Sequence, residues 1–271
     1  MTRIVELKEG EQIEGKYVIK FKKPVDRYAG GYFFQLRIGD SSGEIMLKYW
    51  GGNDEEKVSK LYNSFNKGDV ISVKGRVVRF KNKLEIDVDD KGEIRKLGEG
   101  EYDPKEFIKV TKKDIEQMFE ELMSYVRSIN NEKYRNVLSV FVDDFNFVKK
   151  FKKQPAAMYK HHSWIGGLLE HTLNVTRICD NLARIHPELD RDLLITGAIL
   201  HDIGKIKEFE LTTSIITSKK GMLLGHVALG IEEFIKRTEN LEIDEEIRTK
   251  LIHIIISHHG RIEWGAIKQP A

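Results

Sequence analysis

The chain has 271 residues, which is enough for one large domain or two modest ones. Its 45 basic and 43 acidic side chains leave a net charge of +2, which excludes a polybasic or strongly charged disordered chain. Hydrophobic residues make up 40%, so a sizeable core can form, and the single Cys179 excludes a disulfide scaffold. The first residues lack the apolar run of a signal peptide, and no run of about 20 apolar residues follows. We therefore expect a cytoplasmic protein without a membrane partner.

The small net charge conceals two halves of different composition. Residues 1–98 carry 20 basic and 16 acidic side chains, whereas residues 99–271 carry 25 and 27. The hydrophobic pattern changes as well, from a period of two residues to a period of 3.6. We therefore predict an α+β chain of two domains: a β domain at 1–98, a linker at 99–112 and an all-α domain at 113–271.

The first 98 residues alternate as β-strands do. Phe34, Leu36 and Ile38 share one face of the segment 32–38, and the Asp, Ser and Gly residues at 40–43 favour a hairpin turn. The predicted elements are strands over residues 12–25, 32–38 and 44–50, a helix over 53–65, and strands over 70–80 and 84–88.

This order of elements, with the segments GDSSGEIMLKYW and KGDVISVKGRVV, resembles the five-stranded OB-fold barrel of nucleic-acid-binding proteins. The resemblance implies that single-stranded RNA or DNA lies on one face of the barrel, where bases stack on aromatic rings beside basic side chains. The candidate contacts at outward-facing positions are Phe33, Arg37, Lys48, Trp50, Lys74 and Arg76. Alternatively, the basic residues only solvate the strands and Trp50 caps the barrel.

The rest of the chain has a helical period. Thr111 and Asp114 form a candidate N-terminal cap for a first helix. The segment 212–224 is predicted to be a loop with a short extended stretch. Further helices are predicted over residues 132–152, 163–185, 190–203, 226–238 and 244–259.

Nine histidines are present, and all of them follow residue 160. His171 shares an apolar helix face with Val175 and Ile178, which turns it toward the predicted core. His201 and Asp202 close an almost wholly apolar segment, LLITGAILHDIGK. A carboxylate in such a segment is costly unless it is paired or bound to a metal.

Two more segments carry histidines to the same side. His226 begins one predicted helix, and His258 and His259 end another, in which His258 is in register with Leu251. Imidazole and carboxylate groups bind Mn, Fe, Co, Ni or Zn. Alternatively, these are unrelated core histidines that each bond to backbone, but five residues at inward positions favour a metal site. His161, His186 and His253 are assigned to ordinary surface or core roles.

Four motifs together resemble the HD-domain phosphohydrolases: GGLLEHT, ILHDIGK, LLGH and SHHGRIEWG. An OB-fold followed by this domain, with HHSWIGGLLEHT between them, is similar to the YhaM-type 3′→5′ exoribonucleases. The resemblance runs over nearly the whole chain. It implies an α-helical bundle that holds one or two divalent metals, with Mn²⁺ expected first, and hydrolysis of a phosphodiester by activated water.

The resemblance also assigns roles to single residues. Asp202 bridges the two metals and is catalytic. From its spacing, Lys205 lies on the same helix face three residues after Asp202, and we expect its fixed charge to bind the scissile phosphate and offset the developing charge. Alternatively, Lys205 is a surface residue at a helix end. His162 is a candidate substrate contact. The implied metal ligands are His171, His201 and Asp202 for the first metal, and His226, His258 and His259 for the second.

The C-terminal segment departs from the HD pattern, because HD proteins complete the first metal site with an aspartate on a later helix. The last residue is Ala271, so we expect either a missing C-terminal helix or an impaired first site. The leading prediction is a metal-dependent 3′→5′ exoribonuclease. The alternatives are a nucleotide phosphohydrolase acting on small molecules and a nucleic-acid-binding protein with a degenerate HD site. The sequence does not decide between RNA and DNA as the substrate. It also leaves the oligomeric state open, so a homo-oligomer is one of the alternatives.

Overall fold

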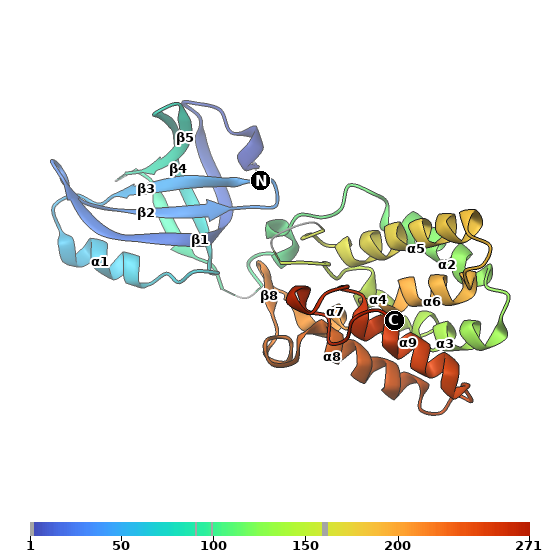
Figure 1. Cartoon of the computed structure of the whole chain (residues 1–271). Coiled ribbons are helices and arrows are strands. Elements are labelled where there is room, and N and C mark those ends of the chain that lie inside the picture. The colour runs from blue at the N-terminus through green and yellow to red at the C-terminus, as the bar shows by residue number, and fades with distance from the viewer. Residues whose placement is uncertain (1–2, 90, 99, 159–161) are drawn as a thin grey trace. The chain divides into compact units, whose positions relative to one another are not determined.

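The computed structural model describes residues 3–89, 91–98, 100–158 and 162–271. The chain forms two compact units, one of Met1–Lys109 with Thr212–Ser214 and one of Val110–Leu211 with Ile215–Ala271. The first unit is built of strands and the second mainly of helices (Figure 1), as predicted for an α+β chain. In the described part of the chain, no helix combines the length and the apolar character needed to cross a membrane.

The described strands of the first unit form one closed sheet. β1 pairs antiparallel with β2 and β4, β2 pairs with β3, and β3 pairs parallel with β5, which returns to β4. This ring of strands, with one helix between β3 and β4, confirms the predicted OB-fold. The elements are η1 (Ile4–Glu6), β1 (Gln12–Tyr28), β2 (Gly31–Gly39), β3 (Glu44–Trp50), α1 (Glu55–Asn63), β4 (Val70–Phe80), β5 (Lys83–Val88), β6 (Glu93–Lys96) and η2 (Pro104–Phe107).

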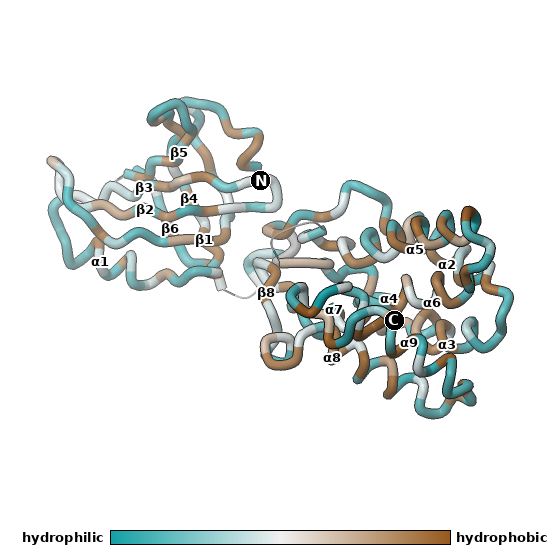
Figure 2. The backbone as a smooth tube through the Cα atoms, in the orientation of Figure 1, coloured by the Kyte–Doolittle hydropathy of each residue, from teal (hydrophilic) through white to brown (hydrophobic). Residues whose placement is uncertain are grey.

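Alternation along the strands separates the barrel core from its outer surface. Phe34, Leu36 and Ile38 are fully buried, while Arg37 between them is exposed. The same alternation is visible as changing hydropathy along β2 in Figure 2. The turn before β3 forms because Asp40 accepts hydrogen bonds from the backbone N–H groups of Ser42 and Gly43.

The predicted linker at 99–112 begins as part of the barrel unit. Phe107 is buried and packs with Leu97, Val18 and Val70 of the first unit. The short strand β6, which pairs with β4, was not predicted from the sequence. Both segments lie against the barrel, so the division between the two units falls at Lys109–Val110.

The second unit packs its helices around one core. Leu122, Leu138, Leu173, Phe234 and Leu251 belong to this core and are fully buried or nearly so. The elements are α2 (Ile115–Arg127), α3 (Glu132–Val142), α4 (Phe145–Phe151), α5 (Gly167–Ile185), α6 (Arg191–Leu200), α7 (Lys205–Glu208), β7 (Phe209–Leu211), β8 (Ile215–Thr217), α8 (Lys219–Thr238), α9 (Glu245–Ser257) and η3 (Ile262–Trp264).

The helix predicted over residues 132–152 is wrong, because α3 and α4 are separate. Asp143 ends α3, and the Asp144 side chain accepts hydrogen bonds from the backbone of Asn146 and Phe147 to start α4. The predicted loop at 212–224 is also wrong in part. Besides β8 it contains the first turns of α8, which Ser218 caps.

Helix α5 buries the predicted apolar face only near its N-terminal end, where Leu168 is fully buried. Ile178 is 60% exposed and Leu182 is 43% exposed, whereas Leu169 and Leu173 are buried. The helix also begins at Gly167 rather than at residue 163. His171 therefore reaches the site from the edge of the helical core.

Candidate metal centre and nucleic-acid face

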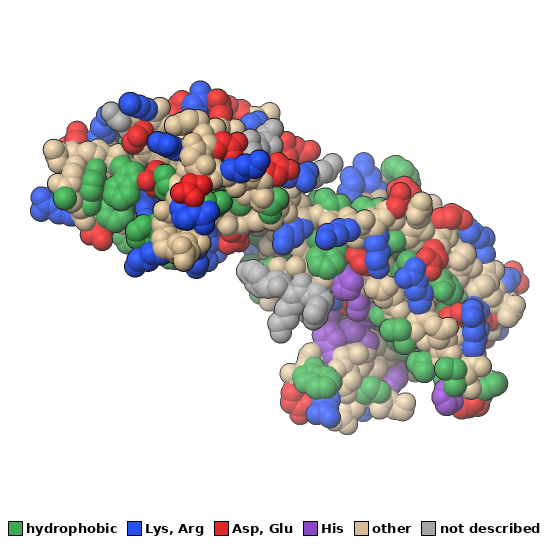
Figure 3. Space-filling view, turned by 90° about the horizontal axis from the view of Figure 1, so that it is seen from above, with side chains coloured by type: hydrophobic (Ala, Val, Ile, Leu, Met, Phe, Trp, Pro, Cys, Tyr) green, Lys and Arg blue, Asp and Glu red, His purple; other side chains and the backbone are tan. Residues whose placement is uncertain are grey.

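Histidine side chains gather in a hollow of the helical unit, where they are purple in Figure 3. Several helix ends meet there, so the chain brings together residues that are far apart in sequence. The predicted ligands come from α5 (His171), the turn after α6 (His201 and Asp202), the second half of α8 (His226) and the end of α9 (His258 and His259).

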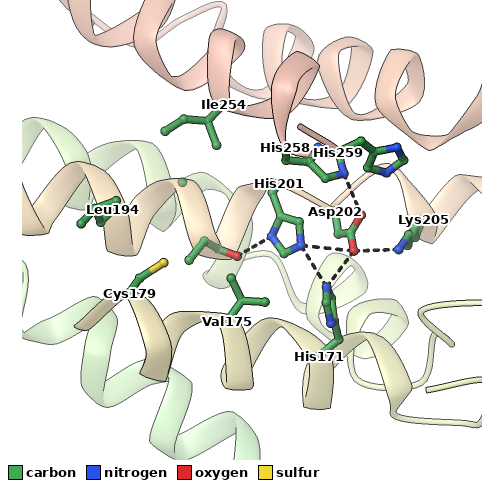
Figure 4. Close-up of a pocket in the computed structure, with 12 residues that line it drawn as sticks. His171, Val175, Cys179, Leu194, His201, Asp202, Lys205, Ile254, His258 and His259 are labelled. Carbon is green, nitrogen blue, oxygen red and sulfur yellow. Dashed lines mark hydrogen bonds and ion pairs between the residues drawn. The ribbon is translucent and has the colours of Figure 1, made fainter. Parts of the chain in front are cut away.

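The first donor group consists of His171, His201 and Asp202 (Figure 4). Asp202 Oδ2 lies 3.3 Å from His171 Nε2 and 3.2 Å from His201 Nε2. The two imidazole Nε2 atoms are 3.1 Å apart. Asp202 is 2% exposed, so water hardly solvates its carboxylate.

The second donor group consists of His226, His258 and His259. His226 Nε2 and His259 Nε2 are 3.1 Å apart. The other oxygen of Asp202, Oδ1, lies 3.7 Å from His226 Nε2 and 3.5 Å from His258 Nε2. Asp202 therefore directs one oxygen to each donor group, which is the arrangement that a bridging carboxylate needs.

Four of these imidazoles are fixed in orientation through Nδ1. In each case the partner is a group that only accepts hydrogen bonds, so Nδ1 carries a proton and, in a neutral ring, Nε2 carries the lone pair. The partners are the Ala198 carbonyl for His201, the Ile255 carbonyl for His258, the Trp264 carbonyl for His259 and the Glu208 carboxylate for His226.

This tautomer leaves unpaired acceptors facing one another. With both rings neutral, His226 Nε2 and His259 Nε2 direct lone pairs at each other across 3.1 Å. Among the described residues, buried Asp202 Oδ1 and His258 Nε2 have no hydrogen-bond partner. Buried acceptors of this kind are costly unless a cation or a donor satisfies them. Nitrogen and oxygen donors without a thiolate suit a divalent transition metal, so the residues fit such an ion.

The protonation states agree with this chemistry. Burial alone would raise the pKa of Asp202, but the neighbouring His201, His171 and Lys205 hold this pKa well below its ordinary value. Burial lowers the pKa of His258 to about 4, although Asp202 opposes the shift. Burial also lowers the pKa of His259. At neutral pH the group therefore contains an ionised carboxylate and neutral His258 and His259, the forms that bind metals.

A cavity of about 450 Å³ opens on both donor groups. Its polar end holds Lys205, whose Nζ lies 2.7 Å from Asp202 Oδ2 (Figure 4). The Lys205 side chain is 14% exposed, so this lysine belongs to the site rather than to the open surface. The apolar wall consists of Val175, Cys179, Leu194, Gly197, Ala198 and Ile254.

His162 lies beside the first donor group. Its ring centroid is 5.6 Å from that of His171, and its backbone has a φ of 59°. Gly167 makes this approach possible, because a Cβ there would lie 2.0 Å from the His162 carbonyl oxygen. The predicted substrate contact is thus placed near the cluster.

The other histidines have different surroundings. His186 Nδ1 lies 3.1 Å from Glu188, and His253 Nε2 accepts a hydrogen bond from the Ala271 backbone. His161 lies outside the described residues. Neither His186 nor His253 belongs to a metal-binding group found among the described residues.

The candidate nucleic-acid face is an aromatic cluster on the outside of the barrel. Phe33 and Trp50 stack with centroids 5.2 Å apart, and Tyr28 contacts both rings. The barrel therefore presents rigid aromatic surface, which suits base stacking.

The basic residues predicted for this face differ in their surroundings. Arg37 and Arg76 are exposed, and Lys74 is exposed beside Glu14 at 3.3 Å. Lys48, in contrast, is 8% exposed and lies 2.5 Å from Glu85 and 3.9 Å from the centre of the Phe80 ring. Lys48 was expected at an outward-facing position, but its side chain is buried, because Glu85 and Phe80 cover it and Glu85 pairs with its charge.

Comparisons with known proteins agree with both units. The model of the HD domain matches residues 168–270, and that of an OB-fold nucleic acid binding domain matches residues 18–95. The chain is 32% identical over 264 residues to the 3′-5′ exoribonuclease YhaM of Bacillus velezensis. The aligned residues cover 96% of this chain and 80% of that protein. The proteins of the same name from Bacillus licheniformis and Bacillus subtilis are each 30% identical over 262 residues, with the same coverage. The chain belongs to the YhaM family. The resemblance predicted from its motifs is thereby confirmed.

The structure of this YhaM-family chain adds residues that the sequence did not single out. Glu208 contacts His226, and Glu170 accepts hydrogen bonds from Thr111 and Trp164 beside His162. Glu208 follows the HD motif by six residues, and this proximity is the one signal that points to it. Tyr28 belongs to the aromatic cluster, and only the length of β1 could have indicated it.

Proposed function

We propose that this chain is a divalent-metal-dependent 3′→5′ exoribonuclease that hydrolyses single-stranded RNA. The observation that carries the proposal is Asp202, whose two oxygens face two histidine groups in one cavity. Family membership supports the direction of digestion and the choice of RNA. The OB-fold unit supports a single-stranded substrate, because such barrels bind unpaired bases on aromatic rings.

The proposed ligands divide as the two donor groups do. His171, His201 and Asp202 hold one ion, and the second group, with the other Asp202 oxygen, holds another. When bound, two divalent ions supply Lewis-acid chemistry that lowers the pKa of water and neutralises charge on a phosphodiester. Mn²⁺ is the ion we propose, because the site mixes nitrogen ligands with a carboxylate.

Lys205 and His162 act on the substrate in this proposal. Lys205 Nζ lies 2.7 Å from Asp202 Oδ2, and from this position it can bind a non-bridging oxygen of the scissile phosphate. His162 lies next to His171 and contacts the terminal nucleotide.

The barrel holds the strand without reading its sequence. Phe33 and Trp50 stack bases, and Arg37, Lys74 and Arg76 attract the phosphate backbone. We place the protein in the cytoplasm, where RNA is available and the Cys179 thiol stays reduced.

End-labelled RNA tests the proposal directly. Purified protein with Mn²⁺ should shorten 5′-labelled single-stranded RNA to a ladder of products and release labelled mononucleotide at once from 3′-labelled RNA. EDTA should abolish both reactions, and a DNA strand of the same sequence should be cut more slowly. Release of phosphate from mononucleotides without RNA shortening would instead identify a small-molecule phosphohydrolase.

A further inference from the structure

Glu208 is the last residue of α7 and contacts His226 of the second donor group. Its carboxylate oxygens lie 3.2 and 3.3 Å from His226 Nδ1, and Oε1 also accepts a hydrogen bond of 3.2 Å from the His226 backbone N–H. One carboxylate therefore holds both the ring and the backbone of this histidine. The side chain of Glu208 is 14% exposed, so water competes little for these bonds.

A break in α8 makes the backbone bond possible. Gly225 has φ 68° and ψ 165°, which interrupts the helix one residue before His226. A helix that restarts there leaves N–H groups without acceptors on the preceding turn. Glu208 supplies the acceptor for the first of them and so caps the second half of α8.

The position of Glu208 is fixed by the chain on both sides. Its backbone N–H donates to Gly204, and its carbonyl accepts from the N–H of Ser218, the residue that caps the start of α8. Gly221 allows this contact, because a Cβ there would lie 2.4 Å from the Glu208 carbonyl oxygen. The start of α8 is therefore anchored on the same residue whose carboxylate holds His226.

His226 differs in this respect from the other anchored histidines. His201, His258 and His259 donate through Nδ1 to neutral backbone carbonyls. His226 donates to a negatively charged group. A carboxylate at Nδ1 makes the opposite ring nitrogen a better electron donor than a carbonyl does, and it also locks the ring orientation.

We propose that Glu208 is a positioning residue that sets the metal affinity of the second donor group through the orientation and basicity of His226. The inference rests on the metal centre proposed above. It predicts that the two donor groups respond differently to one substitution, since Glu208 contacts His226 and the first donor group is anchored through Ala198.

Two variants separate the charge of Glu208 from its shape. E208Q keeps an oxygen that can accept from His226 and removes the charge, whereas E208A removes the acceptor as well. The matched control is E210Q, because Glu210 lies two residues away and is exposed. Metal-stripped wild-type protein and each variant are titrated with Mn²⁺ by calorimetry, and Co²⁺ absorption spectra report the ligand geometry.

We expect the weaker binding to be confined to one site. E208Q should weaken one Mn²⁺ site about 10-fold and E208A about 10–100-fold, with the other site unchanged and E210Q like wild type. The Co²⁺ spectrum should change in the same order. Unaltered binding of both ions by E208Q overturns the inference, and so does equal weakening of both sites with a lowered melting temperature. If wild-type protein binds no divalent ion, the proposed metal centre itself fails.

Discussion

The two units of this chain carry their functions in different ways. In the helical unit, the proposed function depends on the identity of a few polar side chains, such as Asp202, that meet in one cavity. In the barrel, the proposed function depends on a surface of stacked rings and exposed charges, which several residues share. We therefore expect single substitutions to abolish activity in the helical unit and only to weaken binding in the barrel.

The largest effect is expected for D202N, which keeps the shape of the bridging residue and removes its charge. Several kcal/mol of transition-state stabilisation come from such metal sites, so RNA hydrolysis should fall about 10³-fold or more. The assay is degradation of 5′-labelled RNA with Mn²⁺. D143N is the matched control, because Asp143 is exposed at the end of α3. A D202N protein as active as the control would contradict the role of Asp202.

A smaller loss is expected for K205A. Removing one group that offsets developing charge typically costs about 10²–10³-fold in kcat. Because Lys205 contacts Asp202 and belongs to neither donor group, Mn²⁺ should still bind. The control is K220A, since Lys220 is exposed on α8. Loss of Mn²⁺ binding with unchanged folding would mean that Lys205 supports the metal site instead of the phosphate.

Substitutions in the barrel should have a smaller effect, and they should change only the affinity for RNA. W50A and F33A each remove one ring of the stacked pair, and stacking contributes about 1–3 kcal/mol per base. Affinity for single-stranded RNA should therefore fall about 5- to 150-fold, measured by fluorescence anisotropy. Hydrolysis of bis(p-nitrophenyl) phosphate should not change, because this small substrate does not need to bind to the barrel. F145A serves as the control, because Phe145 is an exposed ring of the helical unit. Loss of hydrolysis of this small substrate would erase the distinction between the units.

The smallest effect is expected on the salt dependence of RNA binding, which should differ between substitutions of two basic residues of the barrel. R37A should reduce the slope of log affinity against log salt by about 0.7, as expected for one phosphate contact on a single strand. K48A should leave that slope unchanged, because Lys48 is already paired with Glu85. Leaving Glu85 unpaired should instead lower the free energy of unfolding by about 1–3 kcal/mol. Equal salt slopes for R37A and wild type would remove Arg37 from the binding face.

Most of the fold could be predicted from the sequence because it follows from the period of the hydrophobic residues. The donor residues could be predicted because they are histidines and an aspartate in recognisable motifs. Alternation placed Phe34 inside the barrel, and the histidine motifs singled out the residues that converge on Asp202. The break between α3 and α4 was missed, because the apolar period continues across Asp143 and Asp144 although Asp144 caps a new helix.

Other features depend on contacts that are distant in sequence. Lys48 follows the pattern of an outward residue, but Glu85 and Phe80 on neighbouring strands cover it. Ile178 fits the apolar period of α5, yet it is exposed, since the period does not fix which face turns inward. Glu208 meets His226 only because a hairpin and a kink lie between them.

Metal binding by wild-type protein and by D202N tests the central claim most directly. Metal-stripped protein is titrated with Mn²⁺, and bound metal is then quantified by mass spectrometry after gel filtration. The account predicts one ion for each of the two donor groups in the wild type, and at least tenfold weaker binding in D202N, because Asp202 faces both groups. Wild-type protein without bound divalent metal, or D202N with the same affinity as wild type, would contradict it.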